Sequence, residues 1–117
     1  MFFGRAVGRI LAWNAPVDMR KSFDTLIALT RGLLQEDPLS GTLFVFINRR
    51  QTHLKMLMWD RTGFVVVAKR LERGKFSFCG EEGKREICDK ELELLMDGVL
   101  RERKCMHAPQ PYANQDA

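Results

Sequence analysis

The stretch that most strongly decides the fold runs from Leu43 to Arg70 and reads LFVFINRRQTHLKMLMWDRTGFVVVAKR. It contains three apolar runs separated by short polar segments, and we predict these runs to be strands: Leu43–Ile47, Leu54–Trp59 and Phe64–Arg70. The first run is apolar throughout, which is typical of a central strand in a sheet. Asp60 to Gly63 has the composition of a hairpin turn. Because the connections are short, we expect the three strands to pair as an antiparallel meander.

Positive charge is concentrated in and just after this stretch. The whole chain has 19 Lys and Arg residues against 15 Asp and Glu, for a formal net charge of +4. From position 49 to position 75 the only acids are Asp60 and Glu72, and the cations are Arg49, Arg50, Lys55, Arg61, Lys69, Arg70, Arg73 and Lys75. Cations clustered on ordered backbone are suited to contact phosphate groups. The alternative is a solvated strand end of mixed charge.

Upstream of these strands we predict a short first strand at residues 9–13 and then one long helix. Asp18 is suited to cap a helix from Met19 to Glu36, whose apolar residues follow helical spacing. Arg20 and Lys21 would then occupy the first helical turn, where the helix dipole disfavours cations. They therefore either point into water or bind an anion together with the free backbone N–H groups.

Downstream we predict a short fourth strand at Lys75–Phe78, a charged linker at about 79–88 and a short helix at Asp89–Asp97 that Gly98 would end. Residues 105–117 are expected to form a disordered tail. These elements predict a single domain over residues 1–104, with its core in about 9–78. We therefore expect an α+β fold: a curled antiparallel β-meander with one long helix packed on a face and a short C-terminal helix.

The candidate binding residues follow from these elements. Arg49 and Arg50 occupy the tip between two predicted strands, and a guanidinium can bind a phosphate or a guanine edge through two parallel hydrogen bonds. Trp59, at a strand end, is either part of the core or a residue for base stacking or partner contact. The predicted nucleic-acid-binding set is Arg20, Lys21, Arg49, Arg50, Lys69, Arg70, Arg73 and Lys75.

Several classes of protein are disfavoured. Three cysteines without C-x-x-C spacing and two isolated histidines argue against a disulfide framework, a zinc site and a Ser-His-Asp or Cys-His set, so we expect no metal and no cofactor. No apolar run approaches the roughly 20 residues that cross a bilayer, so no membrane association is expected. A metal-dependent nuclease needs converging carboxylates, for which the candidates are Asp18, Asp24, Asp60 and Glu72. Capping, solvent exposure, turn formation and neighbouring cations explain these four, so we expect no enzyme activity.

Five motifs occur in an order and spacing that resemble a known family. They are Asp18-Met19-Arg20-Lys21-Ser22-Phe23-Asp24, Asp37-Pro38-Leu39-Ser40-Gly41, Leu43-Phe44-Val45-Phe46, Trp59-Asp60 and Lys69-Arg70-Leu71-Glu72-Arg73-Gly74-Lys75-Phe76. Together they resemble the TnpB accessory proteins of the bacterial insertion-sequence-sixty-six family, also called the Orf-two-like family. The resemblance covers residues 10–78, and Gly98 resembles a position in the family's C-terminal region.

The resemblance implies a gene of a mobile element, carried beside another small protein and a DDE-type transposase that would hold the strand-cutting carboxylates. We therefore expect a non-catalytic accessory protein of DNA transposition, located in the cytoplasm with the nucleoid, that binds DNA or the transposase complex through a basic surface. The alternative is a protein-interaction module that docks on the transposase without touching DNA, anchored by Trp59 or by the apolar helix at Leu92–Met96. A metal-dependent nuclease is a third hypothesis.

Overall fold

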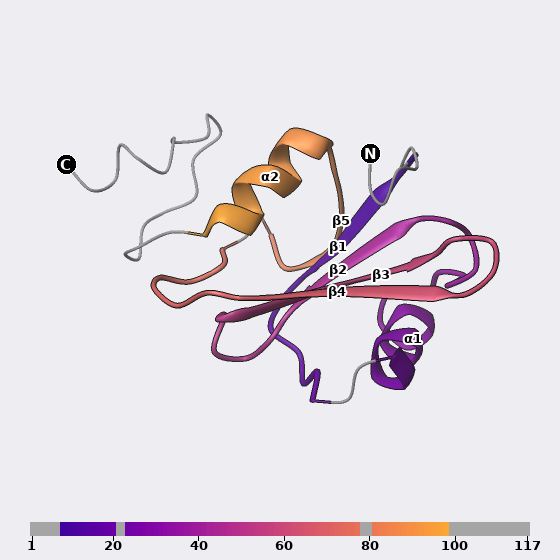
Figure 1. Ribbon diagram of the computed structural model, residues 1–117, viewed down its shortest axis with the longest axis horizontal. Coiled ribbons are helices and arrows are strands. Elements are labelled where there is room, and N and C mark those ends of the chain that lie inside the picture. The colour runs from indigo at the N-terminus through magenta and orange to yellow at the C-terminus, as the bar shows by residue number, and fades with distance from the viewer. Residues whose placement is uncertain (1–7, 21–22, 78–80, 99–117) are drawn as a thin grey trace.

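Five strands form one mixed sheet, and a helix packs against each of its faces (Figure 1). The computed structural model describes residues 8–20, 23–77 and 81–98. In chain order the elements are β1 (Ile10–Asn14), α1 (Phe23–Gly32), β2 (Leu43–Ile47), β3 (His53–Trp59), β4 (Phe64–Arg70), β5 (Gly83–Ile87) and α2 (Asp89–Asp97). The fold class is α+β, as the sequence predicts.

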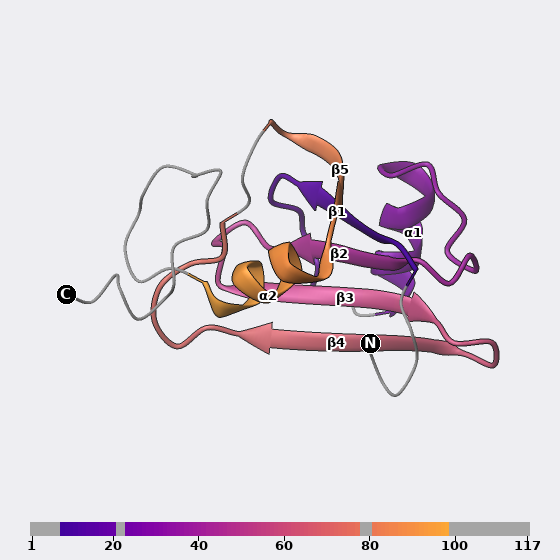
Figure 2. The same ribbon diagram turned by 90° about the horizontal axis from the view of Figure 1, so that it is seen from above.

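The order of the strands across the sheet is β4-β3-β2-β1-β5 (Figure 2). β2, β3 and β4 pair antiparallel through short turns, as predicted. β1, however, pairs parallel to β2, with Ile10 opposite Leu43, and β5 pairs antiparallel to β1. The prediction of a wholly antiparallel meander is therefore wrong. The physical reason is that the connection from β1 to β2 contains α1, and a helical crossover returns the chain to the end of the sheet where the first strand began.

The core lies on both faces of the sheet, with β2 in the middle. All five residues of β2 are buried, which confirms its predicted central position. Its side chains alternate between two clusters. On the α2 face Val45 joins a cluster that contains Met56, and on the α1 face Phe44 joins a cluster that contains Leu26 and Leu57. Burial on both faces explains why this strand reads as an uninterrupted apolar run.

α1 is shorter at both ends than the predicted helix Met19–Glu36. Asp18 does not cap it, because the Asp18 carboxylate accepts hydrogen bonds from the backbone N–H and the guanidinium of Arg20 instead. Met19 is buried, as an apolar residue of the predicted stripe should be, but it reaches the core from the segment before the helix. Phe23, which begins the helix, is largely exposed. The long-helix prediction is therefore wrong. Met19 and Leu26 do belong to one core cluster, but Met19 lies in the non-helical segment before α1 and Leu26 lies in the helix itself.

β5 overturns the predicted linker at 79–88. This strand pairs with β1 over its whole length, and it forms the second edge of the sheet. Its three central side chains are charged, and Lys84 forms an ion pair with Glu36, while Arg85 forms one with Glu91. A strand built in this way lacks the alternating apolar residues by which strands are found in a sequence.

α2 agrees with the prediction of a helix at Asp89–Asp97. Leu92 and Leu95 are buried in the core cluster on its face of the sheet. At its start the Cys88 backbone N–H donates to Glu91 Oε1 (3.1 Å), a contact typical of a capped first turn. Gly98 follows the helix with a φ of 70°, which glycine adopts without strain.

The predicted fourth strand at Lys75–Phe78 does not form in the described part of that segment, residues 75–77, where only an isolated bridge occurs. Instead of turning back along β4, this segment reverses at Gly74 (φ 81°) and bonds to the β2–β3 turn, where the Phe76 N–H donates to the Gln51 carbonyl (2.8 Å). Phe78 lies outside the described residues. So do the predicted tail at 105–117 and the first seven residues of the predicted domain.

Candidate nucleic-acid interface

The turn between β2 and β3 and the loop after β4 lie together at one end of the sheet, on the left in Figure 1 and Figure 2. Two backbone hydrogen bonds join them. The Leu71 N–H donates to the Thr52 carbonyl (2.9 Å), and the Phe76 N–H donates to the Gln51 carbonyl (2.8 Å). The two segments are consequently held in a fixed relation to each other.

Asn48 shapes the turn between β2 and β3. Its side-chain carbonyl accepts hydrogen bonds from the backbone N–H groups of Thr52 (2.9 Å) and His53 (3.0 Å). An Asn side chain that bonds the backbone in this way substitutes for a backbone turn and stabilises a tight loop. The tip residues Arg49 and Arg50 are left exposed on an ordered turn.

Phe76 anchors the loop after β4, since its side chain is fully buried in the α2-face cluster. The Gln51 side-chain amide also donates to the Phe76 carbonyl (3.3 Å). Gly74, with a φ of 81°, adopts the left-handed conformation that lets the loop reverse. Arg73 and Lys75, on either side of this glycine, are exposed.

Four exposed cations therefore share this end of the sheet, and we call them the basic end: Arg49, Arg50, Arg73 and Lys75. None of the four forms an ion pair with any residue of the described ranges 8–20, 23–77 and 81–98. Acidic Glu81 and Glu82 precede β5 at the same end, but across the width of the sheet, because β5 starts beside the end of β1. The positive charge is concentrated on the β2–β3–β4 half.

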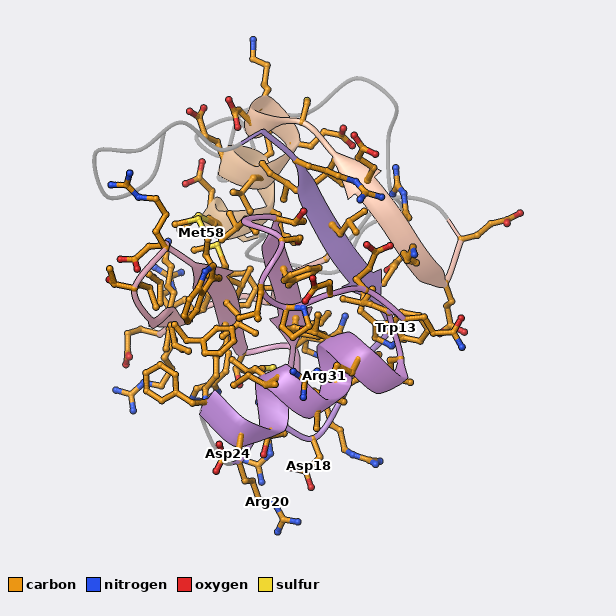
Figure 3. The ribbon with its side chains drawn as sticks, turned by 90° about the vertical axis from the view of Figure 1, so that its right-hand side faces the viewer. Trp13, Asp18, Arg20, Asp24, Arg31 and Met58 are labelled. Carbon is orange, nitrogen blue, oxygen red and sulfur yellow. The ribbon has the colours of Figure 1, made fainter. Side chains whose placement is uncertain are left out.

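Arg20 lies close to the basic end but already has a partner. Its guanidinium forms a two-point ion pair with Asp18, with Nη2 and Oδ2 2.8 Å apart, and both side chains point away from the sheet (Figure 3). The hydrogen bond from Arg20 holds the pKa of Asp18 below its usual value, and the charge of Arg49 adds to this lowering. The Val17 N–H donates to the Ile47 carbonyl (2.9 Å), which places this segment beside the end of β2. Because α1 begins further along the chain, the predicted conflict between Arg20 and the helix dipole does not arise.

The remaining predicted cations differ from one another. Arg70 pairs with Glu72, with Nε and Oε2 2.9 Å apart. Lys69 points to the α2 face, where its Nζ donates to the carbonyl of Met96 (2.7 Å). Lys21 lies outside the described residues. Of the eight predicted binding residues, the structure thus leaves four exposed and without an ion-pair partner among the described residues.

Trp59 lies at the opposite end of β3 from the basic end. Its ring is half-buried and packs edge-on against Phe64, with ring centroids 5.1 Å apart and planes at 64°. β3 begins with His53 beside the basic end and finishes at Trp59, so the two positions are about 20 Å apart along the strand. The structure does not bring Trp59 together with the cations, and a partner contact at this residue stays a prediction.

The carboxylates that a nuclease would need do not converge among the described residues. Asp60 belongs to the β3–β4 turn, where its Oδ1 accepts hydrogen bonds from the N–H groups of Thr62 (3.2 Å) and Gly63 (3.1 Å). Asp18 and Glu72 are paired with arginines. Within the part of the chain that the structure describes, no group of three or more His, Cys, Asp or Glu residues could hold a metal ion.

One contact that the sequence analysis missed removes Lys55 from the basic surface. Lys55 Nζ donates to the carbonyl of Met19 (2.9 Å), which brings the segment before α1 onto the sheet. The signal that could have found this is the alternation of β3, which puts Lys55 on the same face as buried Leu57. A lysine on a covered face is expected to bond a carbonyl rather than a ligand in solution.

Comparison with known proteins identifies the family. Residues 8–105 match the family model described as IS66 Orf2 like protein. The chain belongs to the IS66 Orf2-like family. The family context is that of accessory proteins of IS66 insertion elements, so the chain is associated with transposition. The matched residues include every strand and helix of the described part of the chain, and hence the whole basic end.

Two relatives of this IS66 Orf2-like chain come from Sinorhizobium fredii. The uncharacterized protein y4jC is 36% identical over 92 residues, which cover 78% of this chain and 79% of y4jC. The uncharacterized protein y4hO is also 36% identical over 92 residues, which cover 78% of this chain and 80% of y4hO. No solved structure matches. Neither helix in the described residues is long and apolar enough to span a membrane.

Proposed function

We propose that this chain is a non-catalytic accessory protein of DNA transposition that binds DNA phosphates through the basic end. The proposal rests on one observation: four exposed cations from two separate segments meet at one end of the sheet, without ion-pair partners among the described residues. Phosphate contacts require cations that are free to exchange small counterions for the nucleic-acid backbone. The family supports the transposition context. The proposed partners are DNA of the element's ends or of any sequence, the transposase and the other small protein of the element, with the nucleoid as the place of action.

Within the predicted set, the structure suggests a ranking. Arg49 and Arg50 can each bind a phosphate through two parallel hydrogen bonds. Arg73 and Lys75 lie on the loop after β4, which is hydrogen-bonded to the turn that carries these two arginines. The other members are secondary: to reach a phosphate, Arg20 and Arg70 would leave a carboxylate and Lys69 would leave a carbonyl. We therefore expect the four residues of the basic end to supply most of the electrostatic affinity.

The test is a salt titration of binding with the purified chain. Two duplexes of equal length are compared, one carrying the element's terminal repeat and one carrying its scrambled sequence. If each cation of the basic end neutralises one phosphate, the log–log slope of affinity against salt should be about −3.6. Preference for the terminal repeat would make the chain an end-recognition factor, and equal affinity would make it a non-specific DNA clamp.

Two matched double variants test whether DNA binding takes place at the basic end. Arg49→Ala/Arg50→Ala removes two cations of the basic end and should make the slope shallower by about 1.8. Arg31→Ala/Arg61→Gly removes two exposed cations from the last turn of α1 and the β3–β4 turn, which lie on the right in Figure 1, away from the basic end, and should leave the slope unchanged. Glycine is chosen at position 61 because Arg61 has a φ of 87°. Equal effects of the two pairs, or no binding at low salt, would overturn the proposal.

A specific observation also favours docking on the transposase as a second function. Phe23 (47% exposed) begins α1 and Leu33 (40% exposed) directly follows it, and a shallow pocket lined in part by Thr25, Ala28 and Leu29 lies along the same helix. This surface would replace the anchor predicted at Leu92–Met96, which is wrong because its buried leucines pack on the chain's own sheet. Capture of purified transposase that survives nuclease treatment and is lost in Phe23→Ser/Leu33→Ser would support docking, and capture that requires DNA would refute it.

A further inference from the structure

The outer edge of β4 offers a complete row of backbone groups for pairing. β4 is the first strand of the sheet, and among the described residues it pairs with β3 alone (Figure 2). The Gly63 carbonyl accepts from Asp60, and the Leu71 N–H donates to Thr52, so the odd-numbered residues of β4 exchange hydrogen bonds with β3. By alternation, the N–H and C=O groups that turn outward belong to Phe64, Val66, Ala68 and Arg70.

This edge has few of the features by which proteins keep a free edge from pairing, since its only charged residues are Lys69 and Arg70 at the end of the strand. Free edges are commonly short, bulged, or interrupted by proline or lysine. β4 pairs with β3 in seven consecutive positions without a bulge, and its first five residues, Phe64 to Ala68, are apolar. The other edge of the sheet, β5, is different: it has five residues and carries the charged sequence Lys84-Arg85-Glu86. Among the described residues, β4 is therefore the longer and the more apolar of the two edge strands.

We propose that β4 pairs antiparallel with β4 of a second copy of this chain, about a two-fold axis at Val67. Two five-stranded sheets would then join into one continuous sheet. In this register Val66 forms a hydrogen-bonded pair with Ala68 of the second copy, and Phe64 forms one with Arg70 of the second copy. Val67 lies opposite its own equivalent, as a symmetric interface requires.

The side chains of β4 favour a second copy of β4 as the partner strand, and they also favour the register with the axis at Val67. With the axis at Val67, each Arg70 meets the ring of Phe64, a favourable cation–aromatic pair, and Lys69 lies opposite Val65. Moving the axis toward the C-terminal end of the strand would bring Lys69 or Arg70 against its own equivalent, and directly opposed like charges are destabilising. The sequence of β4 is thus complementary to itself when antiparallel, which is the argument for a second copy over an unrelated strand.

The pairing does not depend on DNA binding. β4 ends next to the basic end of its own copy, and the two strands run in opposite directions. The two basic ends would therefore lie at opposite ends of the paired strands, about 24 Å apart along them. A chain that dimerises but binds no DNA would support this inference and refute the proposed function, so the two can fail separately.

The first test is the mass in solution of the full chain, whose monomer is 13.5 kDa. We expect sedimentation equilibrium at increasing concentration to give twice this mass. Ala68→Pro should return the chain to a monomer, because it removes an outward N–H at the centre of the interface. It should leave the fold intact, since Ala68 is exposed and its N–H is not bonded to β3. The matched control Ala68→Thr keeps the N–H and should remain dimeric. A monomeric wild type, or a dimer that Ala68→Pro leaves unchanged, would overturn the proposal.

The second test reads the register and remains decisive if Ala68→Pro fails to fold. In a background with serine at positions 79, 88 and 105, Val67→Cys should form an intermolecular disulfide under diamide. Opposed residues of a non-hydrogen-bonded antiparallel pair have Cα atoms about 4.5 Å apart, within disulfide range. Val65→Cys is the matched control, since Val65 is half-buried on the same face. In the proposed register, however, its two copies are about 13 Å apart along the strand. We expect cross-linking at least tenfold faster through position 67, and equal rates or no cross-link would overturn the register.

Discussion

Replacing Phe76 with alanine should destabilise the fold by about 3–5 kcal/mol, the range for deleting a fully buried Phe side chain from a core. Phe76 is the residue through which the core holds the loop that carries two cations of the basic end. Its side chain enters the α2-face cluster, while its backbone N–H and carbonyl both bond to Gln51 in the β2–β3 turn. With a urea m-value of about 2 kcal/mol/M, this loss should lower the unfolding midpoint by roughly 2 M.

The assay is urea unfolding followed by circular dichroism. Ser77→Ala, at the exposed neighbouring position, is the matched control and should change stability by less than about 0.5 kcal/mol. Because a small domain has only about 5–15 kcal/mol in total, Phe76→Leu provides a milder variant with an expected loss of roughly 1.5 kcal/mol. A loss below about 1 kcal/mol for Phe76→Ala would refute the reasoning, since it would mean that this ring does not fill the core.

Three further predictions follow from single contacts. Gly98→Ala should destabilise by about 1–3 kcal/mol, because Gly98 (φ 70°, ψ −175°) lies in a backbone region open essentially to glycine alone. An added Cβ at this position would lie 2.6 Å from a carbon of Leu71, whereas at Gly41, also at positive φ, it would meet nothing within 4 Å. Comparing the thermal unfolding of Gly98→Ala and Gly41→Ala therefore separates the cost of the steric contact from the cost of a positive φ. Lys84→Met should raise the pKa of Glu36 toward the ordinary 4.5, since the hydrogen bond from Lys84 is the main cause of its lowering. An NMR titration that shows no rise in this pKa would contradict the ion pair between Lys84 and Glu36. In the wild type this pair's contribution to stability should be complete at neutral pH and be lost as pH falls from about 4.5 through the lowered pKa. Asp60→Ala should cost about 1 kcal/mol by removing the hydrogen bonds within the β3–β4 turn, and an unchanged urea midpoint would argue against them.

The strands of the meander were predictable because local signals coincide there. β2 and β4 have the predicted bounds, since each is an apolar run closed by turn residues, and the bonds of Asp60 account for the predicted hairpin. α2 was predictable for the same reason, as its apolar face and terminal glycine lie within one short segment. β5 was not, because an edge strand with charged side chains carries no apolar alternation. The parallel pairing of β1 and the late start of α1 depend on contacts across the chain, such as the bond from Val17 to Ile47.

The sequence by itself determined that the chain would be an α+β domain with its cations concentrated after position 48. Both properties follow from residues close together in the chain. Only the tertiary structure decided which cations are available. It brought Arg49 and Arg50 to the loop that Phe76 anchors, and it assigned Lys69 to a carbonyl at the end of α2. The physical reason is that the availability of a charge depends on its neighbours in space, and here the hydrogen bonds that set those neighbours join residues 19 to 27 positions apart.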